Sequence, residues 1–162
     1  MKLLKLWAAS IFIVGAPCSG QNALVAGLSL SPGLINTSGT DFAETAGVEI
    51  DPSSPDGDTV TAEALSEAQI DGARRWTNDR LAETAAKHAG AAPLVPLRTI
   101  GGLPRDSLRI GMLDAIYPDS RFIYVNRNPA QALTRMTAIW KAGTVITHPV
   151  CRAGTARNGR CR

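Results

Sequence analysis

Hydrophobic residues along this chain occur in short runs that glycine, proline and small polar residues separate. Two runs rich in β-branched and aromatic residues predict buried strands, at 11–15 (Ile-Phe-Ile-Val-Gly) and 121–126 (Arg-Phe-Ile-Tyr-Val-Asn). A further short strand is expected near 94–98. Between the strands the pattern predicts helices, over 22–30, 61–88 and 104–116, and a last one that starts at Pro129 and is ended by Gly143. Strands that alternate with helices indicate an α/β domain built on a parallel sheet.

The last two predicted helices carry apolar stripes at helical spacing. Each stripe is expected to face the core: Leu108, Met112 and Ile116 in one helix, and Leu133, Met136 and Trp140 in the other. Asn128 is suited to cap the last helix, with Pro129 in its first position and Gly143 after its end. The helix over 61–88 is predicted to be solvated, with a bend at Gly72 and one packed aromatic residue, Trp76. Residues 36–58 are rich in Ser, Thr, Gly, Asp and Pro and predict a loop.

The first sixteen residues allow two interpretations. Lys2 and Lys5 precede an apolar run from Leu6 to Ala16, which has the form of a secretory signal with Gly20 as a small residue for cleavage. The run is too short to span a bilayer. Alternatively, the run contains a buried strand that enters a tight turn and then a helix. The turn has the features of a binding site, so we favour the strand and keep the signal as the alternative.

The composition of the 162 residues fits one globular domain, since 44% are hydrophobic and 19% are charged. The net charge of +3 does not indicate a nucleic-acid face, because four arginines among the last twelve residues account for more than this excess. From Leu6 to Ala73 the chain has no Lys, Arg or His. An anion site in this region therefore depends on backbone N–H groups at a helix N-terminus. The odd number of Cys residues favours a reducing compartment.

A strand, a Gly/Ser-rich turn and a helix start follow one another at 11–22, Ile-Phe-Ile-Val-Gly-Ala-Pro-Cys-Ser-Gly-Gln-Asn. Such a turn directs backbone N–H groups toward a phosphate at the positive end of a helix dipole. Gly15 and Gly20 have the spacing of a Walker-type loop, but Gln21 and Asn22 occupy the positions of its Lys and Ser/Thr. ATP or GTP hydrolysis is therefore not expected. A tight turn without a ligand is the structural alternative.

A second candidate for ligand binding lies at 117–129, Tyr-Pro-Asp-Ser-Arg-Phe-Ile-Tyr-Val-Asn-Arg-Asn-Pro. Arg127 follows the predicted strand and precedes a helix N-terminus, and parallel sheets bind their ligands at this edge. Its planar guanidinium matches a phosphate, and the helix start adds N–H groups. Alternatively, Arg127 only pairs with an acid such as Asp114 or Asp119.

Together these segments resemble the bacterial sulfotransferase family, a P-loop-related family that uses 3′-phosphoadenosine 5′-phosphosulfate (PAPS). The family's first motif, approximately F-I-V-G-x-P-R-S-G-T-T, is matched by Phe12, Ile13, Val14, Gly15, Pro17, Ser19 and Gly20. Its later motif, F-P-D-A-R-F-I-x-x-x-R-D-P followed by W-x-x-G, is matched by Pro118, Asp119, Arg121, Phe122, Ile123, Arg127, Pro129, Trp140 and Gly143. Between them, 103–110 (Leu-Pro-Arg-Asp-Ser-Leu-Arg-Ile) is similar to the family's T-P-x-N-S-L-R-I segment. The likeness covers about residues 11–149.

The resemblance implies a three-layer α/β fold of the P-loop nucleoside-triphosphate-hydrolase type, incomplete at its C-terminus. It implies that PAPS donates a sulfuryl group to a hydroxyl or amine of a small-molecule or glycan acceptor. The residues it implies for the 5′-phosphosulfate are Gly15, Cys18, Ser19, Gly20, Gln21 and Asn22, and for the 3′-phosphate Arg127, Thr134 and Arg135. Asp41 is the candidate general base, with Glu44 as the alternative.

Several residues depart from the family's pattern at positions that carry chemistry. Cys18 replaces an Arg or Lys, Gln21 and Asn22 replace paired Thr residues, and Gly102 stands where the family has a Lys. Arg135 occupies the position of a Ser in the family. Thr40 stands where many members have an acidic general base, and in this chain Asp41 is adjacent to it. Each charge-assisted hydrogen bond to phosphate contributes about 1.5–3 kcal/mol, so the lost cations weaken donor binding.

The expected organisation is a sulfotransferase-like domain over 1–150 and a basic tail over 151–162. We expect no nucleic-acid partner, no membrane span and no metal site from His148, Cys151 and Cys161, and a cytoplasmic location. Two other classes remain open: a non-catalytic remnant or interaction protein of the same fold, and a secreted protein with residues 1–20 as its signal peptide.

Overall fold

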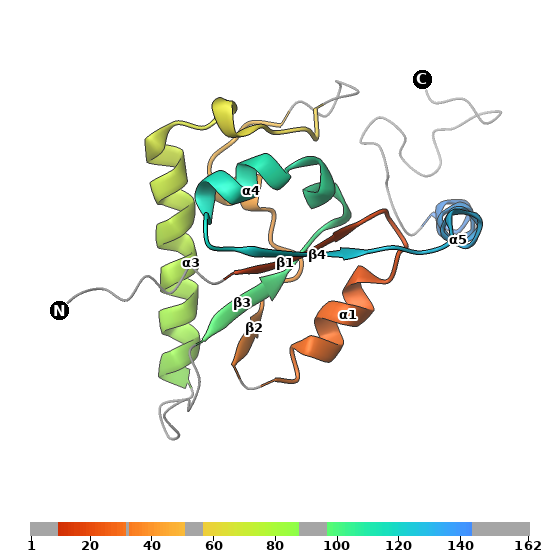
Figure 1. The fold of residues 1–162 in the computed structure, drawn as a ribbon, viewed down its shortest axis with the longest axis horizontal. Coiled ribbons are helices and arrows are strands. Elements are labelled where there is room, and N and C mark those ends of the chain that lie inside the picture. The colour runs from red at the N-terminus through yellow and green to blue at the C-terminus, as the bar shows by residue number, and fades with distance from the viewer. Residues whose placement is uncertain (1–9, 32, 51–56, 88–96, 144–162) are drawn as a thin grey trace.

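A parallel sheet with helices on both faces organises the molecule. The computed structural model describes residues 10–31, 33–50, 57–87 and 97–143. In these residues a four-stranded sheet has the order β2-β3-β1-β4, formed by β1 (Ile11–Gly15), β2 (Leu34–Asn36), β3 (Arg98–Gly101) and β4 (Arg121–Val125). Helix α1 (Gln21–Leu28) lies on one face, and α4 (Ile110–Ile116), with α3 (Glu67–Lys87) beside it, lies on the other (Figure 1). The predicted three-layer α/β fold with a parallel sheet is confirmed.

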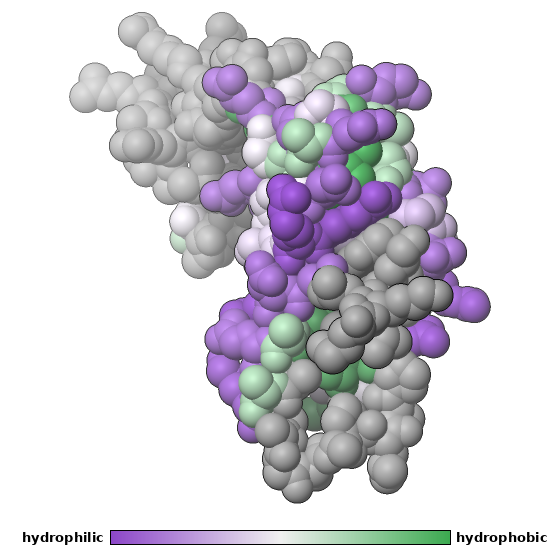
Figure 2. Space-filling view, turned by 90° about the vertical axis from the view of Figure 1, so that its left-hand side faces the viewer, coloured by the Kyte–Doolittle hydropathy of each residue, from purple (hydrophilic) through white to green (hydrophobic). Residues whose placement is uncertain are grey.

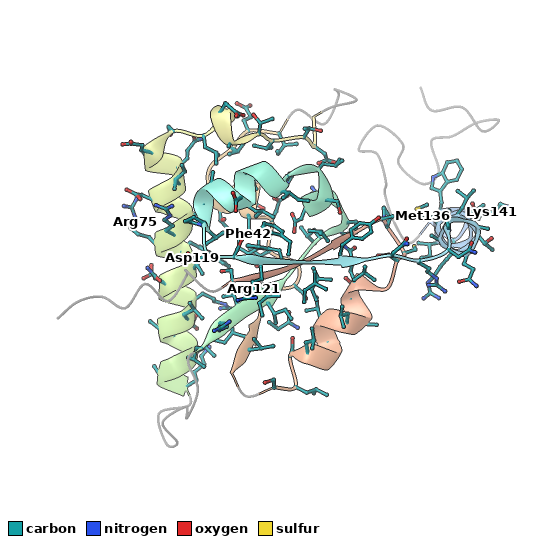
Figure 3. The ribbon with its side chains drawn as sticks, in the orientation of Figure 1. Phe42, Arg75, Asp119, Arg121, Met136 and Lys141 are labelled. Atoms are coloured by element: carbon teal, nitrogen blue, oxygen red, sulfur yellow. The ribbon has the colours of Figure 1, made fainter. Side chains whose placement is uncertain are left out.

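Strand β1 supplies side chains to two cores, because successive residues of a strand point to opposite faces. Phe12 and Val14 pack with Met112 and Ile116 of α4 on one face. Phe42, from the short helix α2 (Phe42–Thr45), points into this core and meets Phe12 edge to face at 5.2 Å between ring centroids (Figure 3). On the other face, Ile13 packs with Val25 of α1 and Ile100 of β3. The strand is therefore buried from both sides.

The apolar run near the N-terminus forms the central strand from Ile11 onward, as predicted. Both β3 and β4 pair directly with this strand. A chain cleaved at Gly20 would lose the strand that joins them, so this fold requires that residues 11–15 are retained. Residues 1–9 lie outside the described part of the chain, and a cytoplasmic rather than secreted location stays a prediction. Among the described residues, no helix combines the length and the apolar character that a bilayer crossing requires.

The long polar helix starts later than predicted and is continuous through Gly72. A short 3₁₀ turn, η2 (Ala62–Ala64), precedes α3, which begins at Glu67. Ser66 and Gln69 form reciprocal hydrogen bonds across the first turn of α3, a capping box that fixes its start. As predicted, the helix is mainly solvated, and its side of the molecule is largely hydrophilic (Figure 2). Trp76 packs against Phe42, the packed aromatic residue that was expected.

The helix predicted over 104–116 is divided at Arg109. Residues Pro104–Leu108 form a 3₁₀ helix, η3, and α4 starts at Ile110. Leu108 is 56% exposed, so its predicted place in the apolar stripe is wrong, whereas Met112 and Ile116 are buried as predicted. Arg109 is fully buried instead, and its guanidinium pairs with Asp41 at 2.7 Å and Asp58 at 3.1 Å. The change of helix type turns this arginine inward toward the two carboxylates.

Two strands differ from the prediction near the other edge of the sheet. Strand β2 (Leu34–Asn36) falls inside a region without a predicted strand, since three residues are too few to show a period. Its register is set by pairing with β3, for example Ile35 with Thr99. The strand expected near 94–98 is displaced, because β3 runs from Arg98 to Gly101. Residues 94–96 lie outside the described part of the chain.

Strand β4 and helix α5 (Pro129–Lys141) occupy the opposite edge, and their burial differs from the prediction. Strand β4 pairs with β1 alone among the described strands, and Tyr124 is 68% exposed. Leu133 and Trp140 are 60% and 54% exposed, so the predicted burial of this stripe is wrong. The ends of α5 agree with the prediction: Asn128 caps it through a 2.9 Å hydrogen bond from the Ala130 N–H, and Gly143 follows with positive φ. In Figure 3, Met136 and Lys141 lie on α5 at the far end of β4 from α3.

A buried carboxyl group, Asp106, lies within η3. Its Oδ2 accepts a 2.7 Å hydrogen bond from the Leu103 N–H, and its Oδ1 has no hydrogen-bond partner among the described residues. Burial raises the pKa of Asp106 to about 6, against the opposing effect of the Leu103 N–H and of Arg109. The native state therefore binds this proton more tightly than the unfolded chain does. Ionised Asp106 lowers the stability of the fold, increasingly as pH rises from about 4 to about 6.

Replacing Asp106 with Asn is expected to stabilise the protein at pH 7 by up to about 3 kcal/mol, because the amide keeps an acceptor for Leu103 and carries no charge. The difference from the parent should fall below about 1 kcal/mol near pH 4, where Asp106 is protonated in the native state and about half ionised in the unfolded chain. Urea unfolding at several pH values between 4 and 7 measures it. The exposed Asp79→Asn is the matched control and should show no such trend. A constant difference between parent and Asp106→Asn across this range would contradict the assignment.

Candidate functional site

The turn between β1 and α1 has the backbone geometry of an anion site. Cys18 has φ +63° and Gly20 has φ +112°, so two residues of the turn are left-handed. Gly20 is the N-cap of α1, and no side chain caps this helix. The N–H groups of the first turn of α1 therefore face outward without a side-chain acceptor, at the positive end of the helix dipole. This is an arrangement that binds phosphate or sulfate groups.

Ser19 adds a polar group to the inside of this turn. Its side chain is buried, with 8% of the residue exposed, and its Oγ has no hydrogen-bond partner among the described residues. A Cβ built on Gly15 would lie 3.0 Å from this oxygen, so the hydroxyl points toward the beginning of the turn. Buried hydroxyl groups are normally satisfied, so the position of this one suits the donation of a hydrogen bond to a bound anion.

Gln21 and Asn22, the two residues that follow the turn, have different environments. Gln21 is buried and its amide donates a 3.2 Å hydrogen bond to the carbonyl of Ile13. Asn22 is exposed on the first turn of α1. Gln21 therefore stabilises the return of the chain onto β1, and Asn22 is the more accessible of the two.

Arg127 joins the two segments that the sequence pointed to separately. Its Nη1 donates a 3.2 Å hydrogen bond to the carbonyl of Cys18, across 109 residues of sequence. Arg127 follows β4 and the turn follows β1, and these parallel strands end side by side with Gly15 opposite Val125. Among the described residues Arg127 makes no ion pair, so the alternative pairing with Asp114 or Asp119 is not seen there. Both strand ends thus meet at one edge of the sheet, where parallel sheets bind their ligands, and we call this place the crevice.

A hollow of about 490 Å³ continues from Arg127 along α5. Its lining comes from the residue before the N-cap and from one face of this helix: Arg127, Ala130, Gln131, Thr134, Arg135 and Ala138. The Thr134 hydroxyl donates to the carbonyl of Ala130 at 2.8 Å, so its oxygen lone pairs remain available as acceptors. Two guanidinium groups give the hollow its positive charge. Gln131 was missed by the sequence interpretation, although its spacing of three and four residues from Thr134 and Arg135 places it on the same helix face.

No side chain projects from position 102 toward the turn. Gly102 has φ +155°, and a Cβ there would overlap the carbonyl oxygen of Ile13. The carboxyl end of β3 therefore approaches β1 more closely than any other residue type allows. A lysine at this position would require the backbone to shift.

Asp41, the candidate base, lies in an ion-pair cluster. Its Oδ1 accepts hydrogen bonds from the Ala43 N–H, as the N-cap of α2, and from Arg109 at 2.7 Å. Its Oδ2 accepts from Arg105 at 3.2 Å. Because both oxygens are engaged, Asp41 can accept a proton from a substrate only after Arg105, 46% exposed, moves away. The geometry gives Asp41 a structural role first.

Two basic residues of α3 are paired within the molecule. Arg74 donates to the carbonyls of Ile116 and Ala115 at the C-terminus of α4, and Arg80 pairs with Glu83 at 3.1 Å. Within the described ranges no group of three His, Cys, Asp or Glu residues could hold a metal ion. His148, Cys151 and Cys161 lie outside those ranges.

Replacing Gly102 with Ala is expected to destabilise the fold by about 2 kcal/mol or more, because the new Cβ meets backbone and the left-handed conformation is strained. Gly72→Ala in α3 is the matched control. That position has open space, so the same substitution should stabilise the helix by about 0.5–1 kcal/mol. Urea unfolding of both variants measures the contrast, and equal effects of the two would show that the close approach at Gly102 is not present in solution.

The comparison with protein families agrees with this geometry. The model of the sulfotransferase family matches residues 10–155, which include β1, the turn, η3, β4 and α5. Among curated proteins, none matches the chain. Because the family model covers most of the sequence and every segment that builds the crevice, this chain belongs to the sulfotransferase family.

Proposed function

We propose that the chain binds PAPS across the crevice. It transfers the sulfuryl group of PAPS to a hydroxyl or amine of a small-molecule or glycan acceptor. The observation that carries this proposal is the hydrogen bond from Arg127 to the Cys18 carbonyl, which brings the two candidate anion sites together. Membership of the sulfotransferase family supports the reaction class. The donor and the acceptor are parts of the proposal.

The turn suits the 5′-phosphosulfate end of the donor. The uncapped first turn of α1 offers N–H groups, and the unpartnered Ser19 hydroxyl offers a further donor. With Cys18 and Gly102 in place of cations, the turn binds the anion mainly through dipoles. Gly15, Cys18, Ser19, Gly20, Gln21 and Asn22 form this half of the proposed site, with Gln21 supporting the turn from behind.

The hollow on α5 suits the 3′-phosphate. Arg127 and Arg135 supply two guanidinium groups, and the N-terminal end of α5 has the favourable dipole for an anion. Gln131 adds an amide donor to the same lining, and Thr134 can donate to the phosphate once its hydroxyl turns away from the Ala130 carbonyl. The arginine at position 135 brings a charge where the family pattern has a serine, which partly offsets the cations that the turn lacks.

In the proposed transfer the acceptor oxygen or nitrogen attacks sulfur while the bond from sulfur to the bridging oxygen of the 5′-phosphate breaks. The electron pair of that bond passes to the phosphate, so adenosine 3′,5′-bisphosphate leaves. The N–H groups of α1 and the Ser19 hydroxyl stabilise the charge that develops on the leaving phosphate. The acceptor proton passes to a base, which we assign to Asp41 after Arg105 has moved from its Oδ2.

A second candidate function is nucleotide binding without sulfuryl transfer. The engagement of both Asp41 oxygens by Arg105 and Arg109 favours it, because it leaves no free carboxylate at this position. Incubation with PAPS and a panel of hydroxyl and amine acceptors distinguishes the two candidates. Release of adenosine 3′,5′-bisphosphate together with a sulfated acceptor supports transfer, whereas binding without release supports the second candidate.

Arg127→Ala is expected to remove the preference for a 3′-phosphate. The parent should bind adenosine 3′,5′-bisphosphate about 10- to 150-fold more tightly than AMP, the range that one charge-assisted contact of 1.5–3 kcal/mol gives. In the variant the two dissociation constants should approach each other. Isothermal titration calorimetry with both nucleotides measures the ratio.

Arg75→Ala on the exposed face of α3 is the matched control for this experiment and should keep the full ratio. An Arg127→Ala protein that still prefers the bisphosphate by the parent ratio would remove Arg127 from the 3′-phosphate site. A parent protein that binds neither nucleotide would contradict the proposed function as a whole.

Cys18 offers a second test, because its thiol belongs to the proposed 5′-phosphosulfate turn and is partly exposed. Saturating adenosine 3′,5′-bisphosphate is expected to slow alkylation of Cys18 by iodoacetamide about tenfold or more, as the nucleotide covers the turn. Peptide mapping by mass spectrometry follows this residue. The Arg127→Ala variant at the same nucleotide concentration should show weaker protection. An unchanged rate of Cys18 alkylation in the nucleotide-saturated protein would show that the nucleotide does not bind at the turn.

A further inference from the structure

Ser107 on η3 holds the residue that begins the anion-binding turn. The Gly15 N–H donates to the Ser107 Oγ at 2.8 Å, and this hydroxyl donates back to the Gly15 carbonyl at 2.9 Å. One side chain thus satisfies both polar backbone groups of a residue 92 positions away in the sequence. A serine hydroxyl has the one donor and the acceptor sites that this double contact requires.

The contact replaces strand pairing at a place where the sheet ends. Strand β1 pairs with β3 only as far as Phe12 opposite Gly101, whereas its pairing with β4 extends to Gly15 opposite Val125. The Gly15 N–H and C=O that face η3 therefore have no strand partner on the β3 side of β1. The Ser107 hydroxyl takes that position and leaves Gly15 fixed from both sides.

Gly15 has little room to move within these contacts. A Cβ built on it would lie 2.5 Å from the Val125 carbonyl oxygen and 3.0 Å from the Ser19 Oγ. The residue is therefore enclosed by the end of β4, by the inside of its own turn and by Ser107. Any change in the Ser107 contact is transmitted to the peptide units that follow Gly15, which carry the N–H groups of the turn.

The support of Ser107 is itself rigid. Asp106, directly before it, accepts the Leu103 N–H at 2.7 Å, which closes η3. Arg109, two residues after it, is fully buried and binds Asp41 and Asp58. The ion-pair cluster around Asp41 therefore anchors the short helix that fixes the anion-binding turn.

We propose that Ser107 is a positioning residue, whose hydroxyl holds Gly15 and thereby orients the N–H groups of the turn and of α1 toward the 5′-phosphate of the nucleotide. The ligand part of this inference rests on the proposed function. The part that concerns the order of the turn does not, and it is tested without a ligand.

The first measurement is hydrogen–deuterium exchange of a peptide that covers residues 15–20. Ser107→Ala should raise exchange in this peptide severalfold while α3 and α4 keep their protection, and Ser107→Thr, which keeps the hydroxyl, should restore the parent pattern. Ser29→Ala is the matched control, because Ser29 Oγ also donates to a backbone carbonyl, that of Val25, at the other end of α1. If Ser107→Ala does not fold, Ser107→Cys, with its weak hydrogen bonding, should show a smaller rise.

The second measurement is nucleotide affinity. Ser107→Ala should weaken adenosine 3′,5′-bisphosphate and AMP by the same factor, about 5- to 10-fold, because both carry the 5′-phosphate. The preference for the 3′-phosphate should stay at the parent ratio, the opposite of the result expected for Arg127→Ala. Ser107→Thr should bind both nucleotides as tightly as the parent does. A general loss of structure in Ser107→Ala would not leave the ratio of the two dissociation constants unchanged.

Unchanged exchange of residues 15–20 in Ser107→Ala would overturn the inference, whatever the nucleotide results are. The inference would also be overturned if Ser107→Ala bound AMP as tightly as the parent does and bound adenosine 3′,5′-bisphosphate more weakly. A parent protein that binds neither nucleotide contradicts the proposed function alone, since the exchange experiment still decides whether Ser107 orders the turn.

Discussion

The close approach of three chain segments at Gly15 determines the geometry of the crevice. Strand β1 ends there beside the carbonyl of Val125, with the Ser19 hydroxyl on the inside of the turn and the Ser107 hydroxyl bound to its backbone. Only a glycine fits between the first two groups. Because β1, η3 and β4 meet at this residue, the turn, the segment around Ser107 and Arg127 have fixed positions relative to one another. A multiply charged ligand needs this kind of preorganised site.

Charge is distributed unequally over the crevice. The hollow on α5 has Arg127 and Arg135, whereas the turn that receives the other end of the proposed ligand relies on N–H groups and hydroxyls. The neighbouring arginines, Arg105 and Arg109, are paired with Asp41 and Asp58 and hold loops together. These ion pairs hold the scaffold together. They also leave neither of these two arginines nor the Asp41 carboxylate free for the proposed reaction. Because these charged groups are already paired, nucleotide binding and sulfuryl transfer need to be tested separately.

The exposed edge at β4 and α5 shows the limit of sequence patterns. Leu133, Met136 and Trp140 recur at helical spacing, and Phe122 to Val125 form an apolar strand, yet Tyr124, Leu133 and Trp140 are mostly exposed. Periodicity identifies which side chains share a face, but burial requires another element to cover that face. Among the described residues no strand pairs with the outer side of β4. Conversely, Arg109 is charged and yet fully buried, because two carboxylates pair with it in the interior.

The sequence by itself determined the class of fold, the central strand, the turn after it and the cap at Asn128, because these depend on local composition and on residues with restricted backbone preferences. It also identified Arg127 as the cation at a strand end. Tertiary structure alone decided that this guanidinium reaches the Cys18 carbonyl, that Ser107 binds Gly15, and that Asp41 is paired on both oxygens. These contacts join residues 64 to 109 positions apart, and such distances in sequence carry no local signal. They arise only when the parallel strands align their carboxyl ends at one edge of the sheet.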